Sequence, residues 1–188
     1  TIHETGNNAG RLKLVFDKPR KNTVKLLLLM DSGGSMDYYS HLCALLFQAV
    51  SKSNHFKDLK IYYFHNIIKG NLFTTPETHP LETISLDWML RNLSNDYKVI
   101  IVGDARMNPG ELEENTFCAK QGKLSGLGWF RALRDHFPHT VWLNPQEQSG
   151  GGRAFWNQTY YDIQKEVDMY PLTVESLGVA IKKLLAAR

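Results

Sequence analysis

Short, almost continuous apolar runs alternate with amphipathic stretches along most of this chain. Four of these runs predict strands, at residues 24–30, 59–64, 98–102 and 140–143. Such a run between turn residues is typical of a strand that is buried on both faces of a sheet. Apolar residues at helical spacing predict helices that begin at Met36 and that span residues 85–93, 129–137 and 174–185. This alternation predicts a doubly wound, Rossmann-like α/β domain with a mostly parallel sheet and helices on both faces.

Two shorter segments predict strands at the margins of this sheet. Residues 71–74 follow a turn at Lys69 and Gly70, and they predict an antiparallel edge strand. In the segment 12–16, Leu12, Leu14 and Phe16 are apolar on one side, with Lys13 and Asp17 interleaved, which also indicates a short edge strand. We therefore divide the chain into an N-terminal extension, residues 1–23, and an α/β domain, residues 24–188.

Composition narrows the class of protein further. The 188 residues suit one domain, and the net charge of +3 is too small to indicate a nucleic-acid partner. Cys43 and Cys118 are too few for a framework of disulfides or a four-cysteine zinc site. No apolar run reaches the roughly 20 residues that a membrane helix needs. The sequence thus predicts a cytoplasmic protein without a membrane span.

Candidate chemistry follows two of the predicted strands. Asp31 ends the first strand and begins the turn Asp-Ser-Gly-Gly-Ser, which reaches Ser35, and Asp104 follows the strand at residues 98–102. In sheets of this kind ligands bind at the carboxyl ends of the strands. Two carboxylates and a hydroxyl there would suit a hard cation such as Mg²⁺. The alternative is that each aspartate only caps the helix that follows it.

The segment that reads Leu-Leu-Leu-Leu-Met-Asp-Ser-Gly-Gly-Ser-Met, residues 26–36, resembles the first segment of a von Willebrand factor A (VWA) domain. That family carries a metal-ion-dependent adhesion site (MIDAS) with the signature Asp-x-Ser-x-Ser, followed by a threonine and a second aspartate. The resemblance implies that Asp31, Ser35 and Asp104 are metal ligands. Gly33 stands where the family has its first serine.

The threonine of the family is matched by spacing alone. Thr83 precedes the next predicted helix by the distance that the family shows, so the resemblance implies it as the fourth ligand. Thr74, Thr75 and Thr78 lie in the same loop and remain alternatives, and Thr83 could equally cap the helix. The implied cofactor is Mg²⁺ or Mn²⁺, or none, because Gly33 removes one hydroxyl ligand.

Within the VWA family the chain most resembles the bacterial CoxE-like group. Three segments carry this resemblance, at residues 31–36, 62–66 and 103–109. It implies that the domain is the C-terminal module of a longer protein. It also implies a MoxR-type AAA+ ATPase as partner, in the maturation of a protein complex or a metal cofactor.

Three functions remain open on these residues. The favoured one is a protein-interaction module, not an enzyme, that uses the MIDAS-like cation site. The first alternative is a metal-free scaffold with a degenerate site, which would bind partners through helix faces or through the aromatic pair Phe155 and Trp156. The second is a metal-dependent phosphoryl-transfer or hydrolytic enzyme, for which the pair Asp31 and Asp104 is the only rationale.

Overall fold

The computed structural model describes residues 24–51, 56–113, 124–146 and 154–173, together with Ser176, Val179, Lys183 and Leu184. The strand predicted at residues 12–16 and most of the helix predicted at residues 174–185 lie outside these ranges. The elements run in the order β1 (Val24–Asp31), η1 (Gly34–Tyr39), α2 (Ser40–Ser51), β2 (Phe56–Phe64), β3 (Asn71–Phe73), β4 (Thr83–Ser85), α3 (Leu86–Asn92), β5 (Lys98–Val102), α4 (Pro109–Leu112), α6 (Gly126–His136), β6 (Thr140–Asn144), α7 (Ala154–Glu166) and β7 (Asp168–Pro171).

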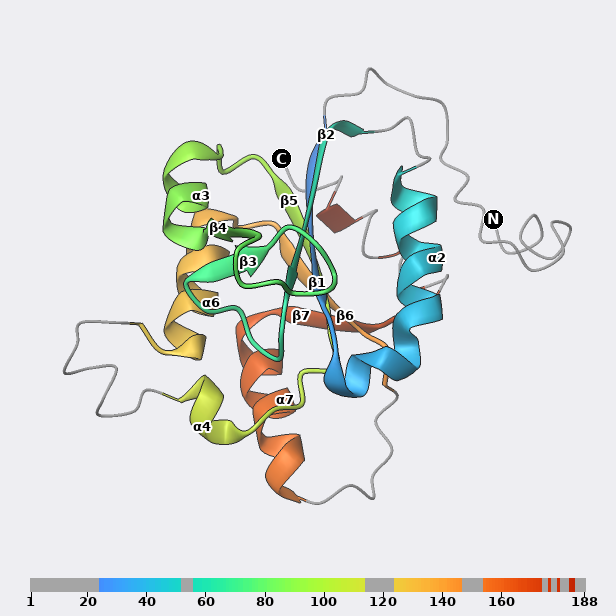
Figure 1. The fold of residues 1–188 in the computed structure, drawn as a ribbon, viewed down its shortest axis with the longest axis vertical. Coiled ribbons are helices and arrows are strands. Elements are labelled where there is room, and N and C mark those ends of the chain that lie inside the picture. Colours follow the sequence, from blue (N-terminus) through green and yellow to red (C-terminus); the bar gives the residue numbers. More distant parts are fainter. Residues whose placement is uncertain are drawn as a thin grey trace, which may run out of the picture.

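The described strands form one seven-stranded sheet in the order β4-β3-β2-β1-β5-β6-β7. Strand β1 pairs in parallel with β2 and β5, and the parallel pairing continues through β6 to β7. Strand β3 runs antiparallel to β2, and β4 adds to β3 as the outermost strand. The predicted doubly wound, mostly parallel sheet with an antiparallel margin is therefore confirmed (Figure 1).

The central strand β1 is apolar on both faces because helices cover both sides of the sheet. Leu27 and Leu29 belong to the core that includes side chains of α3, α6 and α7. Leu26 and Leu28 point to the opposite face and share a core with side chains of α2. Figure 1 shows this division, with α2 on one side of the sheet and α3, α6 and α7 on the other. The prediction that the leucine run is buried on both faces of the sheet is therefore confirmed.

The register of the sheet brings the carboxyl ends of four parallel strands to one level. Asp31 at the end of β1 pairs with Phe64 at the end of β2, and Met30 pairs with Val102 at the end of β5. Val102 in turn pairs with Leu143 near the end of β6. The turns that follow these strands therefore meet at one edge of the sheet, where the sequence placed its candidate site.

Trp142 of β6 packs in the core next to this edge of the sheet. Its ring is fully buried and meets Phe64 and Phe130 edge to face. Its indole N–H donates to the carbonyl of Gly103, with 2.7 Å between the two atoms. This bond fixes the backbone immediately before Asp104.

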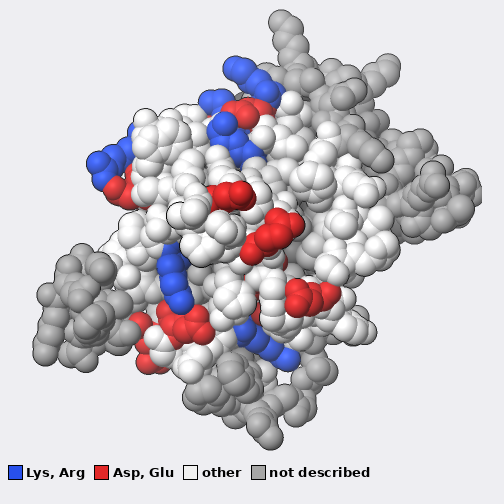
Figure 2. Space-filling view, in the orientation of Figure 1, with Lys and Arg blue, Asp and Glu red and all other residues white. Residues whose placement is uncertain are grey.

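No helix within the described ranges is long and apolar enough to cross a membrane. On the face that Figure 2 shows, Lys and Arg side chains lie among Asp and Glu side chains. That face therefore presents mixed charge, in line with the small net charge of +3.

Candidate functional site

Two buried carboxyl groups lie at the carboxyl edge of the sheet. Asp31, the last residue of β1, is 6% exposed, and Asp104, just after β5, is 1% exposed. The Asp31 Oδ1 accepts a hydrogen bond from the backbone N–H of Asn66, at 2.9 Å. The Asp104 Oδ1 accepts one from the backbone N–H of Arg106, at 3.0 Å. Each carboxyl group is thus held by a backbone donor of the turn next to it.

Ser35 joins the turn after β1 to the end of β5. Its hydroxyl donates to the Asp104 Oδ2 across 2.6 Å. Gly33 and Gly34 shape the turn that carries Ser35, with φ angles of 84° and 60°. These left-handed conformations favour glycine because a Cβ strains them. The serine that the family has at position 33 would therefore be strained in this turn.

Burial dominates the electrostatics of Asp31. Desolvation raises the pKa of its carboxyl group to about 8, and the nearby Asp104 adds to the increase. The hydrogen bond from Asn66 acts in the opposite direction but does not offset the burial. The backbone packs tightly here, since a Cβ on Gly103 would lie 3.1 Å from the Cβ of Asp31. A cation beside the two carboxyl groups would favour the charged form of Asp31.

The oxygen atoms at this edge suit a hard cation. Asp31, Ser35 and Asp104 offer two carboxylates and one hydroxyl, which are the ligand types that Mg²⁺ takes. Among the described residues no group of three or more His, Cys, Asp or Glu is arranged to hold a metal. A cation here would keep several water ligands, as Mg²⁺ commonly does. The residues present fit Mg²⁺ or Mn²⁺ better than a softer metal.

The structure does not bring Thr83 to this group. Thr83 lies in β4, the outermost strand, where it pairs with Phe73 of β3. Both β3 and β2 lie between β4 and β1. The Thr74 hydroxyl donates to the carbonyl of Glu82 at 3.2 Å, and the Thr75 hydroxyl donates to the Glu82 carboxylate at 2.9 Å. The loop itself reaches the site through Pro76, whose carbonyl accepts a hydrogen bond from Ser32.

Asn66 and Glu111 support the site, although the sequence did not single out Glu111. Asn66 has a left-handed backbone, with φ of 62°. Its side-chain amide donates to the Glu111 Oε1 at 3.2 Å, and Glu111 also pairs with Lys69 at 3.0 Å. These contacts hold the turn after β2 so that the Asn66 N–H points at Asp31. The asparagine after a strand was the only sequence signal for this arrangement.

His65 has a structural contact in the same turn. Its ring Nδ1 lies 2.8 Å from the carbonyl oxygen of Ser32, so the tautomer with a proton on Nδ1 donates to that oxygen. The ring therefore links the turn after β2 to the turn after β1. This contact gives His65 a structural role between the two turns.

We expect Asn66→Gly to keep nearly the full stability of the fold and Asn66→Val to lose about 1–3 kcal/mol. Glycine keeps both the left-handed backbone and the N–H that Asp31 needs, whereas a β-branched residue is strained at this φ. Urea denaturation of the two variants measures the difference. Equal loss in both would show that the amide contact to Glu111, and not the backbone conformation, stabilises the turn.

The fold and this turn together define the class of the protein. A doubly wound sheet with Asp-x-Gly-Gly-Ser at the end of its central strand is the arrangement of a VWA-type α/β domain. A family model described as "VWA domain containing CoxE-like protein" matches residues 1–110, and the chain belongs to this family. VWA domains are in general protein-interaction modules. No curated protein and no solved structure matches the chain.

Proposed function

We propose that this domain binds a partner protein through a divalent cation, Mg²⁺ or Mn²⁺, held by Asp31, Ser35 and Asp104. The observation that carries the proposal is the hydrogen bond of 2.6 Å between Ser35 and Asp104, next to the second buried carboxyl group, that of Asp31. It joins the turn after β1 to the end of β5, and Asp31 ends β1 at the same edge of the sheet. A bound cation would supply positive charge and open positions for an acidic ligand.

The chain's own groups would orient such a cation. The backbone N–H of Asn66 fixes one oxygen of Asp31, and the N–H of Arg106 fixes one oxygen of Asp104. The side-chain amide of Asn144 donates to the carbonyl of Asp104 at 2.9 Å and so anchors the backbone beneath it. An Asp or Glu side chain of the partner would complete the cation's ligands, in a charge-assisted contact.

The partner that we propose is a MoxR-type AAA+ ATPase, acting with this domain in the maturation of a protein complex or a metal cofactor. Support comes from the CoxE-like character of the chain, which rests on the family match over residues 1–110. The fold contributes a site at the edge of the sheet in which the two carboxyl groups are buried and Ser35 is exposed.

A metal-free scaffold is the second candidate, and a specific observation favours it. Ser35 already bonds directly to Asp104, and Asp31 is held by Asn66, so the turns stay joined without a cation. Thr83, one of the four threonines that the sequence left open as a ligand, lies in β4, away from these groups. In this case the same edge would bind its partner through protein contacts alone.

Binding of Mn²⁺, followed by electron paramagnetic resonance, distinguishes the two candidates. We expect Asp104→Ala to lower the affinity for Mn²⁺ by 100-fold or more and Ser35→Ala to lower it about tenfold, because each removes one proposed ligand. Asp135→Asn, which removes an exposed carboxylate near the C-terminal end of α6, should leave it unchanged.

Binding of the partner is then measured with and without EDTA, for the wild type and for Asp104→Ala. Binding of a MoxR-type ATPase that is abolished by EDTA and by Asp104→Ala supports the cation-dependent module. Binding that persists in EDTA, or a wild-type protein that takes up no Mn²⁺, contradicts it and supports the metal-free scaffold.

A further inference from the structure

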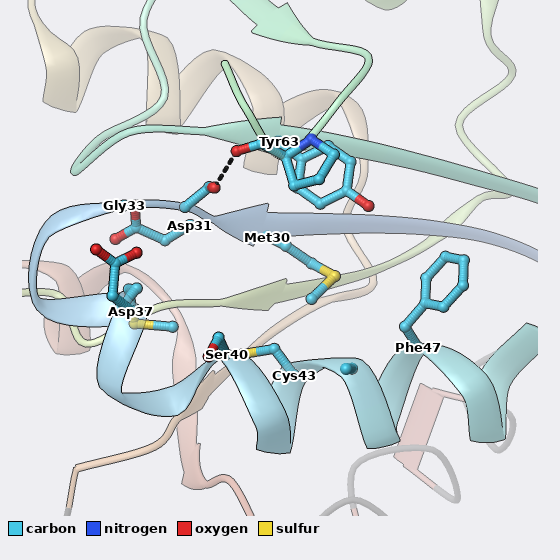
Figure 3. Close-up of a pocket in the computed structure, with 12 residues that line it drawn as sticks. Met30, Asp31, Gly33, Asp37, Ser40, Cys43, Phe47 and Tyr63 are labelled. Carbon is cyan, nitrogen blue, oxygen red and sulfur yellow. Dashed lines mark hydrogen bonds between the residues drawn. The ribbon is translucent and has the colours of Figure 1, made fainter.

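A pocket of about 240 Å³ opens beside Asp31, between the end of β1 and helix α2. Figure 3 shows that its two ends differ. The carboxyl groups of Asp31 and Asp37 lie toward one end, and the side chains of Met30 and Phe47 lie toward the other. The pocket is therefore polar where it meets the candidate metal site and apolar further along α2.

Its walls are mainly apolar side chains. Met30, Met36 and Cys43 are buried and line the pocket, while Phe47 is 36% exposed and also contributes to the wall. Tyr63 and Pro76 line it on the side of the sheet and the following loop. Apolar cavities of roughly 150 Å³ are large enough to hold a benzene ring. This pocket has room for one large apolar side chain.

The pocket and the candidate metal site are continuous. Asp31, Ser32 and Gly33 line the pocket, and the same three residues form the start of the Asp-x-Gly-Gly-Ser turn. A group bound at the carboxyl end of β1 therefore lies next to the pocket's polar end. Any extended segment that reaches Asp31 would place a neighbouring side chain against the pocket.

A cationic side chain fits this pocket less well than an apolar one. The carboxyl group of Asp31 is 6% exposed and already accepts the N–H of Asn66, so little of it is open to a cationic group. Asp37 is exposed to solvent, and exposed ion pairs contribute little to binding. The apolar walls offer the larger gain, since water leaves them when an apolar group enters.

We propose that this pocket receives a large apolar side chain, such as Leu, Met or Phe, that neighbours the acidic residue of the partner segment. The inference rests on the proposed function and makes it more specific. The partner motif would pair a carboxylate, directed to the cation, with an apolar anchor that enters the pocket. Buried anchors of this kind dominate the energetics of many interfaces.

Short carboxylic acids test the idea without an identified partner. Acetate carries only the carboxylate, whereas hexanoate adds an alkyl chain that can enter the pocket. In saturating Mg²⁺ we expect hexanoate to bind at least tenfold more tightly than acetate, because one buried methylene is worth about fourfold in affinity. Equal affinities for the two acids would overturn the inference.

Methionine methyl groups provide the readout by nuclear magnetic resonance. Met30 and Met36 line the pocket, while Met89 and Met107 lie in the core on the opposite face of the sheet. Hexanoate should shift the methyl signals of the first two and leave those of the other two in place. Shifts spread over all four signals would indicate binding elsewhere and would contradict the proposal.

A matched pair of substitutions on α2 locates the alkyl chain. Ala44 is exposed and lines the pocket, so Ala44→Phe should fill it and Ala44→Ser should leave it open. We expect Ala44→Phe to remove the preference for hexanoate over acetate and to leave Mn²⁺ affinity unchanged. A preference that survives Ala44→Phe overturns the inference.

Two further outcomes separate this inference from the proposed function. Normal Mn²⁺ binding with no preference for hexanoate defeats the pocket inference alone. Absence of Mn²⁺ binding defeats both. Hexylamine, which carries a cationic group in place of the carboxylate, is the third probe. It is added to the metal-free protein, and the shifts of the Met30 and Met36 methyl signals are compared with those that hexanoate causes in Mg²⁺. Larger shifts with hexylamine would overturn the choice of an apolar occupant beside an acid.

Discussion

Replacing Asp31 with asparagine is expected to abolish Mn²⁺ binding and, at the same time, to stabilise the metal-free protein at pH 8. The two effects have one cause. Burial of the Asp31 carboxyl group beside Asp104 disfavours its charged form, and a cation would relieve that cost. Asparagine removes the charge while its amide oxygen still accepts the N–H of Asn66. The gain in the free energy of unfolding should be roughly 2 kcal/mol or more at pH 8.

The dependence on pH follows from the direction of this pKa change. The folded protein keeps a proton on Asp31 up to a pKa of about 8, whereas the unfolded chain releases it near the ordinary value of 3.8. Between about pH 4 and pH 8 the folded state thus binds more protons, so stability falls as the pH rises. The slope from this one group is at most about 1.4 kcal/mol per pH unit. Asp31→Asn should flatten it.

Urea denaturation in EDTA, repeated from pH 5 to pH 9, measures this effect. Asp37→Asn is the matched control, since it removes an exposed carboxylate from the same turn and should keep the wild-type profile. Added Mg²⁺ should stabilise the wild type and not Asp31→Asn, because only the folded wild type would bind it. If the free energy of unfolding depends on pH in the same way for wild type and Asp31→Asn, burial does not raise the pKa of the Asp31 carboxyl group.

The central strands could be predicted from the sequence because strands buried on both faces consist of apolar runs. The run Leu26–Met30 is apolar at every position, since helices cover both faces of β1. The inner residues of strands β5 and β6 show the same pattern, and both strands were predicted to within one residue of their observed ends. Complete burial favours apolar side chains there, and the two buried polar residues at the ends of β6, Thr140 and Asn144, are hydrogen-bonded.

The sequence patterns at β4, β7 and α7 were too weak to predict these elements. Strand β4 has three residues and β7 has four, the last of them Pro171, and such short edge strands lack a clear alternation. Helix α7 is rich in aromatic residues and also holds Asn157 and Thr159, and these residue types are weaker helix formers than Ala or Leu. Its buried Thr159 donates to the carbonyl of Ala105 at 2.9 Å, so tertiary contacts stabilise this helix more than its own sequence does.

In the candidate site, too, some residues could be predicted from local sequence and others could not. Asp31 and Asp104 could be placed together because the carboxyl ends of parallel strands meet at one edge, and Ser35 follows Asp31 in the same short turn. Counting residues before a helix suggested Thr83, but residues 83–85 pair with residues 71–73, and this carries Thr83 to the margin of the sheet. The support from Glu111 depends on the left-handed turn at Asn66, which local sequence patterns do not reveal.

Replacing Gly126 with alanine is expected to destabilise the fold by about 1–3 kcal/mol, through steric overlap alone. Gly126 begins α6, and a Cβ there would lie 2.5 Å from the carbonyl oxygen of Glu111 and 3.1 Å from the side chain of Ile67. The first of these neighbours is backbone and cannot move without shifting α4. Because Glu111 and the turn that follows β2 also hold Asn66, the affinity for Mn²⁺ should fall as well.

Gly110→Ala is the matched control in the same region. A Cβ at Gly110, in α4, would lie 3.4 Å from the Asn108 Oδ1, which is ordinary contact, so alanine should leave stability unchanged or raise it by about 0.5–1 kcal/mol. Urea denaturation and Mn²⁺ titration of both variants give the comparison. If Gly126→Ala unfolds at the wild-type urea concentration, α6 does not pack against α4 as closely as described. If it loses stability but keeps full Mn²⁺ affinity, the packing behind Glu111 does not govern the geometry at Asp31, and the site depends on the turn at Asn66 alone.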